Sequence, residues 1–277
     1  MKLIRLFLLA LILIISYFLL TSPLPFQEGL ILIISLLTIL WIISLIVKDA
    51  SIVDSFWGLG FVVLAWFYHF KITDNQNNRS LVLCIITTLW GVRLAWHIYT
   101  RNRGHGEDYR YQEMREEHGE KFWWVSYLRV FVLQGFLLWI IAVPLLIGQT
   151  SNENNLQLFD YLGIMLWIIG FLFEAIGDWQ LVKFKKNPMN KGKVMDEGLW
   201  KYTRHPNYFG DALLWWGYFL FTFSVEGYWT IFSPIIMTFL LMKVSGVALL
   251  EQKLSETKPE YKIYRERTSA FFPYIPK

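Results

Sequence analysis

The sequence has a single cysteine, Cys84, which lies inside an apolar run. One cysteine excludes an intrachain disulfide framework and a metal site built from several thiolates. Charged residues are also scarce, at 17% of the chain, and they nearly cancel to a net charge of +4. The basic loops of a membrane protein account for an excess this small, so no nucleic-acid partner is expected. Low-complexity segments and convincing internal repeats are missing as well.

Apolar residues dominate the composition. They make up 55% of the chain, and aromatic residues make up 18%, which is too apolar for a soluble domain of 277 residues. A helix that crosses the hydrocarbon core needs roughly 20 predominantly apolar residues. Runs of that kind lie near residues 3–20, 30–47, 55–70, 81–99, 127–148, 159–181, 209–225 and 228–249. The third, seventh and eighth runs are interrupted or short. The sequence therefore predicts an all-α fold, a polytopic transmembrane helical bundle of about eight spans, with about seven to nine as the range.

The first apolar run, 3–20, has the basic start and apolar middle of a signal peptide. It is long for such a peptide, and residues 21–23 offer no cleavage site with small residues at the usual spacing. We therefore expect a retained helix. Residues 1–50 would form an N-terminal pair of transmembrane helices, and residues 51–277 the main membrane domain with its C-terminal tail.

Lysine and arginine are distributed unevenly between the predicted loops. With the N-terminus inside, most of them fall in Thr100–Ser126, Lys183–Tyr208 and Glu251–Lys277, whereas the outer loops carry only Lys71 and Arg79. This asymmetry predicts that both termini are cytoplasmic. The three inner segments are also long and aromatic, so any chemistry is expected on that side. The last of them could fold back over a cavity or lie on the membrane surface as an aromatic anchor.

The most informative segment is 198–211, because it places many polar side chains between apolar stretches. Pro206 suits the first position of a helix, where its missing N–H is not needed. The free N–H groups at such a helix start attract phosphates and carboxylates. The polar residues that favour binding here are Lys201, Tyr202, Arg204, His205, Asn207, Tyr208 and Asp211. A basic loop that only obeys the positive-inside rule would explain the cations but not the last three residues.

Two carboxylates, Glu174 and Asp178, lie four residues apart near the inner end of the sixth span. They share one helical face and repel each other, so they should share a cation, a proton or the hydrogen-bond donors of a ligand. One interpretation is a set of acceptors for ribose hydroxyls or an adenine amino group. Another is an ion-pair lattice with Arg93, Lys183 or Lys185. A divalent metal is disfavoured, because no further ligand follows at a suitable spacing.

Three further ionisable residues fall within predicted spans, where such groups are costly and usually functional or paired. Arg93 and His97 are four residues apart and share a helical face. They either take part in a site or extend toward the membrane interface. Asp54 opens the third run and either belongs to a site or caps its helix.

These residues carry a resemblance to a known family. The chain resembles the DUF1295 family of bacterial membrane proteins, which is related to the steroid 5-alpha-reductases. The resemblance runs from residues 54–58 to residues 267–273 and is most specific in 198–211. More distantly, the chain is similar to isoprenylcysteine carboxyl methyltransferases, which share an Arg-His-Pro-x-Tyr element, here at residues 204–208. The family resemblance also implies a bacterial inner membrane.

The reductase resemblance implies a membrane enzyme that binds NADPH in a cytoplasmic cavity of the 51–277 domain. It implies that this enzyme reduces a carbon–carbon double bond conjugated to a carbonyl in a steroid-like or other lipid substrate. The residues placed around the cofactor by the resemblance and by the 198–211 segment are Glu174, Asp178, Lys185, Tyr202, Arg204, His205, Asn207, Tyr208, Asp211 and Glu251. Glu251 stands where the reductases have a histidine, so the charge type differs there.

On the substrate side the resemblance places Asp54 at the position of a glutamate and Trp90 at the position of a tyrosine. In the reductases that pair polarises the substrate ketone, and tryptophan is a far weaker acid. Asp54, Trp90 and Arg93 are therefore the predicted catalytic residues, with Asp54 or Arg93 stabilising the negative charge that develops on the carbonyl oxygen.

Other classes stay open on the sequence. An S-adenosylmethionine-dependent membrane methyltransferase is the first alternative, because Glu251 could accept hydrogen bonds from that cofactor. A non-catalytic lipid-binding membrane protein is the second. The expected partners are the bilayer and a hydrophobic small molecule, with no obligate protein partner and no bound metal.

Overall fold

The structure is a computed structural model that describes residues 24–72, 77–151, 153, 155–244, 247, 251, 254 and 260–276. Its regular elements are helices, and within the described residues no strand is formed apart from an isolated bridge between Thr203 and Ser269. The predicted all-α class is therefore confirmed. The first predicted span, 3–20, lies outside the described residues.

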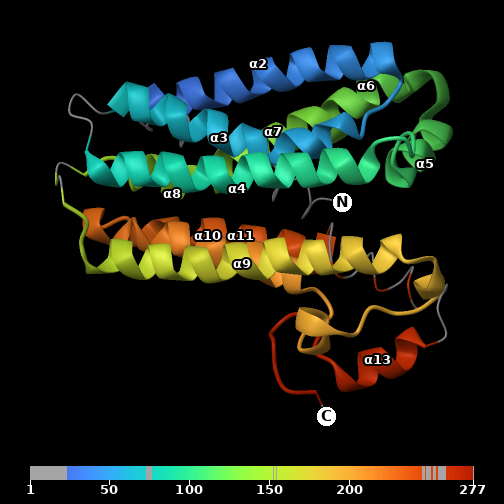
Figure 1. Cartoon of the computed structure of the whole chain (residues 1–277). Coiled ribbons are helices and arrows are strands. Elements are labelled where there is room, and N and C mark those ends of the chain that lie inside the picture. Colours follow the sequence, from blue (N-terminus) through green and yellow to red (C-terminus); the bar gives the residue numbers. More distant parts are fainter. Residues whose placement is uncertain are drawn as a thin grey trace, which may run out of the picture.

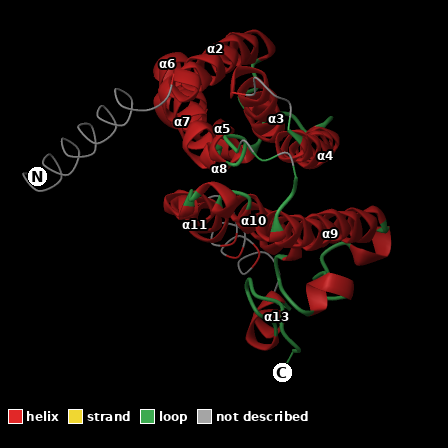
Figure 2. Ribbon diagram, turned by 90° about the vertical axis from the view of Figure 1, so that its left-hand side faces the viewer, coloured by secondary structure: helices red, strands yellow, loops and turns green. Residues whose placement is uncertain are grey.

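The helices form two layers (Figures 1 and 2). The first layer contains α2 (Leu24–Val47), α3 (Ile52–Ile72), α4 (Asn78–Asn102), α5 (Tyr109–His118), α6 (Phe122–Ser126), a π-helical turn (Tyr127–Val132), α7 (Leu133–Ile141) and α8 (Val143–Ile147). The second contains α9 (Leu158–Lys186), a 3₁₀ turn (Gly198–Lys201), α10 (Pro206–Leu220), α11 (Phe232–Phe239), a π-helical turn (Leu240–Val244) and α13 (Tyr261–Arg267). In Figure 1, α13 lies beside this second layer near one end of the bundle.

Five helical segments are long and apolar enough to cross a membrane. They are Leu24–Val47, Ile52–Ile72, Asn78–Asn102, Tyr109–Ile141 and Leu158–Lys186. The predicted count of about eight is not confirmed. The seventh predicted span corresponds to α10, which has 15 residues, and the eighth includes a shorter apolar stretch, Tyr228–Val244. Helix α2 begins at Leu24, earlier than the second predicted run, 30–47.

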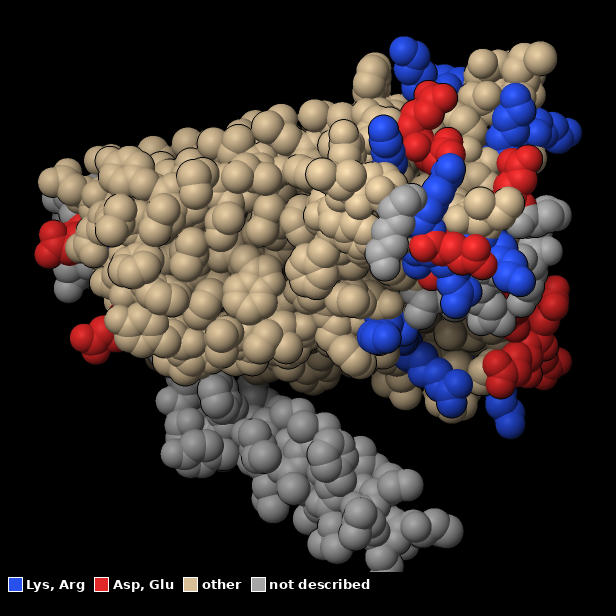
Figure 3. Space-filling view, turned by 90° about the horizontal axis from the view of Figure 1, so that it is seen from below, with Lys and Arg blue, Asp and Glu red and all other residues tan. Residues whose placement is uncertain are grey.

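Charged side chains gather at one end of the bundle, and a broad uncharged band separates them from the other end (Figure 3). We call the first of these the charged end. It includes Lys183, Lys185 and Lys186 in the last turn of α9. This arrangement is that of an integral membrane protein, because an apolar band flanked by polar ends matches a bilayer. Which membrane holds the chain, and which end faces the cytoplasm, stay predictions.

Glycines bring the backbones of α9 and α10 into direct contact. A Cβ atom at Gly170 would lie 2.6 Å from the Gly210 carbonyl oxygen, and one at Gly163 would lie 2.8 Å from the Gly217 carbonyl oxygen. The glycines recur at seven-residue intervals on both helices, which pack antiparallel. Small residues in this spacing let helix backbones approach closely within a membrane. In the first layer, α3 and α4 meet the same way, where Gly58 faces Gly91.

Aromatic side chains fill the middle of the bundle between the layers. Trp215 of α10 packs against Phe61 of α3 and Trp90 of α4, with ring centroids 4.6 and 5.8 Å apart. All three side chains are fully buried. At the end of the bundle opposite the charged end, Arg79 of α4 donates to Asp160 of α9 at 2.7 Å, and both side chains are fully buried. The layers are thus joined by packing in the middle and by an ion pair at one end.

Candidate functional site

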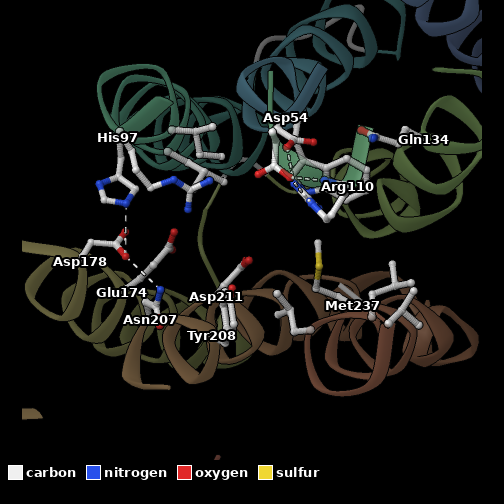
Figure 4. A pocket seen from close by; sticks show the side chains of 18 of the residues that line it. Asp54, His97, Arg110, Gln134, Glu174, Asp178, Asn207, Tyr208, Asp211 and Met237 are labelled. Carbon is white, nitrogen blue, oxygen red and sulfur yellow. Dashed lines mark hydrogen bonds and ion pairs between the residues drawn. The ribbon is translucent and has the colours of Figure 1, made fainter. Parts of the chain in front are cut away.

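A cavity of about 490 Å³ lies between the two layers near the charged end. Its lining comes from α3, α4, α5, α7, α9, α10 and α11 and the turn after α11. Figure 4 shows polar side chains from both layers pointing toward this space. Its volume falls within the range of roughly 300–1,000 Å³ that is typical of small-molecule sites. The cavity is therefore the candidate functional site.

Hydrogen-bond acceptors line the side of the cavity formed by α9 and α10. These are Glu174 and Asp178 on α9 and Asn207 and Asp211 on α10, and we call them the acceptor wall. Each pair is four residues apart, so each pair lies on one helical face. Asn207 and Asp211 follow Pro206, which is the first residue of α10 as predicted. The glycine contacts then hold the two faces side by side, because the Gly210 position abuts the backbone of Glu174.

Arg93 of α4 joins the acceptor wall to the first layer. One terminal nitrogen donates to Glu174 Oε1 at 2.6 Å, and the other donates to Asp178. Trp90 Nε1 donates to the second oxygen of Glu174 at 2.9 Å, and His97 Nε2 lies 3.5 Å from Asp178 Oδ1. Of the alternatives that the sequence left open for these two carboxylates, the structure shows the ion pair with Arg93. The alternative that Arg93 and His97 extend toward the interface is wrong, because both face α9.

Two oxygens of the acceptor wall are left without a donor. Asp211 Oδ1 and Asn207 Oδ1 are buried, and neither accepts a hydrogen bond from the residues that the structure describes. Asn207 instead uses its Nδ2 group to donate to Asp178 Oδ1 at 3.0 Å. A buried polar atom without a partner is costly, which points to a missing ligand or water. Both residues line the cavity, so a donor-bearing ligand placed there would satisfy them.

The opposite side of the cavity is built by α3 and α5. Asp54 accepts hydrogen bonds from Arg110 at 2.7 Å and from the Tyr111 hydroxyl at 2.7 Å. Helix α3 begins at Ile52, so Asp54 lies within its first turn and is not the residue that caps it. Asp108 holds Arg110 from the other side, since its Oδ1 accepts from the Arg110 backbone N–H and from Nε. Burial raises the pKa of Asp108, but these bonds outweigh it and leave the pKa below its ordinary value.

Gln134 of α7 completes this second side, which we call the donor wall (Arg110, Tyr111 and Gln134). Its Nε2 group lies 3.5 Å from the Tyr111 hydroxyl, and all three side chains line the cavity. Apolar residues of α7 and α11, among them Leu137 and Met237, also line the cavity. The cavity thus offers acceptors on one side, donors on the other, and apolar contacts beside them.

Two residues of the 198–211 segment, Arg204 and His205, lie in a separate cluster with Glu251. Arg204 and His205 both bind the Glu251 carboxylate, with Arg204 Nε at 2.7 Å and His205 Nε2 at 3.3 Å. Arg204 also donates to the backbone carbonyls of Arg265 and Thr268 in the C-terminal tail. Burial lowers the pKa of His205. Burial raises the pKa of Glu251, but its hydrogen bonds from His205 and Arg204 outweigh this and lower it overall.

The predicted site residues lie partly in the cavity and partly outside it. Those that line the cavity are Asp54, Glu174, Asp178, Lys185, Asn207, Tyr208 and Asp211. Trp90 and Arg93 reach the acceptor wall from α4 in the first layer and donate hydrogen bonds to Glu174. Arg204, His205 and Glu251 form the separate cluster, and Tyr202 is 41% exposed beside the tail. The roles assigned to all of them stay predictions.

The sequence interpretation missed the donor wall. The sequence indicated Arg110 only as one of the cations of the inner segment Thr100–Ser126, and it gave no reason to single out Tyr111 or Gln134. A local signal exists, because Asp108 is a favoured N-cap residue and accepts from the Arg110 N–H, which starts α5 at Tyr109. A helix starting there would have indicated a folded inner segment. Among the described residues, no group of three or more histidine, cysteine or acidic residues could hold a metal ion.

Comparison with known proteins places these features in context. The chain is 27% identical to an uncharacterized protein of Schizosaccharomyces pombe, over 91% of this chain and 80% of that protein. It is 35% identical to the 3-oxo-5-alpha-steroid 4-dehydrogenase 1 of Bos taurus over 66 residues, which are 24% of this chain and 26% of that protein. A probable O-methyltransferase of Ustilaginoidea virens is 44% identical over 46 residues, or 17% of this chain and 16% of that protein.

No solved structure matches the chain. The S. pombe relative is fungal, so the bacterial origin implied by the resemblance stays a prediction. A family model described as "Protein of unknown function (DUF1295)" matches residues 40–268, which include both walls of the cavity and the Arg204 cluster. The chain therefore belongs to the DUF1295 family of membrane proteins.

Proposed function

We propose that this protein is a membrane-embedded reductase that uses NADPH to reduce a carbon–carbon double bond conjugated to a carbonyl group in a lipid substrate. The observation that carries this proposal is the cavity itself, which is lined by an acceptor wall, a donor wall and apolar side chains. A polar cofactor and an apolar carbonyl compound need these two kinds of surface next to each other.

The acceptor wall suits the polar part of a dinucleotide. Its free oxygens, Asp211 Oδ1 and Asn207 Oδ1, are placed to accept from ribose hydroxyls or an amino group. Lys185 and Arg101 also line the cavity, and cations bind phosphate oxygens through charge-assisted hydrogen bonds. When bound, NADPH would supply the hydride, while the protein supplies orientation and electrostatics.

The donor wall suits the carbonyl end of the substrate. Negative charge develops on the carbonyl oxygen during hydride addition, and a preorganised donor beside it lowers the barrier. Arg110 is the best placed donor, because Asp54 and Asp108 hold its guanidinium in the cavity lining. Arg93 is less suitable, because both of its terminal nitrogens already donate to α9. The partial similarity to a 3-oxo-5-alpha-steroid 4-dehydrogenase supports this reaction type.

A second candidate function is methyl transfer from S-adenosylmethionine. The acceptor wall favours it, since three carboxyl groups there face one guanidinium, and an amine or sulfonium cation would pair with the carboxyl group that Arg93 does not bind. The short similarity to a probable O-methyltransferase points the same way.

Thermal unfolding of the purified protein with NADPH, NADH and S-adenosylmethionine in parallel tests these proposals. A ligand at about 100 times its dissociation constant stabilises the native state by roughly 2.7 kcal/mol. We expect stabilisation by NADPH, and then turnover of enone-containing lipids. Stabilisation by S-adenosylmethionine alone would replace the reductase by a methyltransferase. No stabilisation by any of the three, with well-folded protein, would favour a non-catalytic lipid-binding role.

A further inference from the structure

The end of the C-terminal tail runs back along the second layer after α13. Its path is fixed by hydrogen bonds to the Arg204 segment. The Arg204 N–H donates to the Ser269 carbonyl at 2.8 Å, and the Thr203 hydroxyl donates to the Phe271 carbonyl at 2.9 Å. The Tyr274 N–H then donates to the Tyr202 carbonyl at 3.1 Å. Residues 271–276 are therefore held against the bundle.

Ring contacts give the depth of this segment along the bundle. Phe271 and Phe272 pack on Phe209, with centroids 5.9 and 6.3 Å away, and Phe209 packs on Phe173 of α9 at 5.2 Å. Lys183, the first cation at the charged end of α9, follows Phe173 by 10 residues. At 1.5 Å per residue, the Phe173 level lies about 15 Å from the Lys183 level, toward the apolar band. The tail thus returns to the depth of the uncharged band.

Side chains at the end of the tail are exposed although they are apolar. Phe272 is 65% exposed and Ile275 is 82% exposed. Helix α9 also exposes apolar side chains near this depth, including Leu172 and Ile176. Those helix residues face lipid in an integral membrane protein, because the hydrocarbon core lies at that level. Phe272 and Ile275 would add to the same surface.

Part of the segment's backbone is hydrogen-bonded to the protein, as non-helical backbone at membrane depth requires. A backbone N–H without a partner is costly in hydrocarbon. Pro273 and Pro276 have no N–H, and the N–H groups of Phe271 and Tyr274 are hydrogen-bonded. Few donors remain to be satisfied in a stretch that is not helical.

We propose that residues 271–276 form a re-entrant segment whose backbone is held against the protein and whose exposed apolar side chains are inserted among the lipid acyl chains of the leaflet at the charged end. Phe272 and Ile275 are the inserted side chains, and the partner is the hydrocarbon part of the bilayer. The segment leaves the polar α13 and returns into the membrane beside α9 and α10. This inference does not depend on the proposed reductase activity.

The test uses the full chain in nanodiscs, with an environment-sensitive NBD label on Ile275→Cys. The matched control is Ile263→Cys on α13, since Ile263 is comparably exposed, at 63%, but lies on the polar helix. The native Cys84 is buried and is not expected to react. We expect blue-shifted emission at position 275, with most of it lost in lipids brominated on the acyl chains and little lost with aqueous iodide. Position 263 should show the reverse.

Equal iodide quenching at the two positions, without quenching by brominated lipid at 275, would overturn the proposal. Should the labelled variants fail to fold, hydroxyl-radical footprinting of the unmodified protein in nanodiscs gives the same answer. Oxidation of Phe272 in the folded protein should then be low relative to the unfolded chain, although the protein itself leaves this side chain exposed. Strong oxidation of Phe272 in folded protein would place the segment in water.

Discussion

Replacing Arg93 by glutamine should destabilise the fold strongly, because the variant leaves two carboxylates without their cation. The Glu174 and Asp178 side chains are only 3% and 7% exposed. Removing one partner of a buried ion pair costs about 3–5 kcal/mol. The Arg93 side chain is itself 19% exposed, so we expect a loss near the lower limit, about 3 kcal/mol.

A second substitution distinguishes this cause from a loss of packing. Glu174→Gln removes one of the two uncompensated charges and keeps an oxygen that can accept from Trp90. The double variant Arg93→Gln with Glu174→Gln should therefore lose less stability than the two single variants added together. Residues in direct contact typically show coupling energies of about 0.5–3 kcal/mol, and we expect a value above about 1 kcal/mol.

The assay is reversible unfolding in mixed micelles of dodecyl maltoside and SDS, followed by tryptophan fluorescence. Arg129→Gln is the control, because Arg129 is exposed and makes one long contact, to His118; such a variant should stay within about 0.5 kcal/mol of the wild type. The reasoning is refuted if Arg93→Gln is as stable as this control. Strict additivity in the double variant would also refute it, since the carboxylates would then not depend on Arg93.

The remaining predictions concern the acceptor wall, the helix contact beneath it and the Arg204 cluster. Asp211→Asn should weaken NADPH binding about tenfold, or about 1.4 kcal/mol, in a titration, because it replaces one carboxyl oxygen of the acceptor wall by an NH₂ group that cannot accept; Asp196→Asn, at a partly exposed residue paired with Arg267, should bind normally, and equal affinities would exclude the assigned site. Gly210→Ala should destabilise the protein by about 1–3 kcal/mol in the same micelle assay, since its Cβ would lie 2.4 Å from the Glu174 backbone nitrogen; an unchanged midpoint would contradict the close packing. Burial lowers the pKa of His205 below the ordinary 6.5, so the fold favours its neutral form and loses stability as the pH falls through about 6.5. Between pH 7.5 and 5.5 the wild type should lose up to about 1.4 kcal/mol more than His205→Gln, and parallel pH profiles would show that His205 does not titrate in this range.

The sequence predicted the helical runs and the start of α10 well, because both depend on local chemistry. Apolar runs require helices in a membrane whatever their partners, and Pro206 favours the first helical position by its own geometry. The Glu174 and Asp178 pair was also predictable, since two carboxylates at this spacing on an apolar helix need a shared partner. That Arg93 is this partner was one of the alternatives that the sequence left open.

The donor wall and the Arg204 cluster could not be read in the same way, because both depend on distant segments. Arg110 reaches Asp54 across 56 positions, and Arg204 reaches Glu251 across 47. A motif such as residues 204–208 shows that its residue types are suited to binding, but not which ligand or segment they bind. In the structure the Arg204 guanidinium binds the C-terminal tail. Of the polar residues in segment 198–211, Asn207 and Asp211 are the two that both line the cavity and have a buried oxygen without a hydrogen-bond partner.

The backbone contact between α9 and α10 fixes the relative position of these two helices, and with it one side of the cavity. Glycines pressed against backbone atoms leave no room for the two helices to slide, so Glu174, Asp178, Asn207 and Asp211 keep one mutual geometry. Side chains on α5, α7 and α11 carry no such constraint. If relatives act on different substrates, they should therefore diverge on those three helices while keeping α9 and α10 alike, so that one unchanging half-site would serve chemically different ligands.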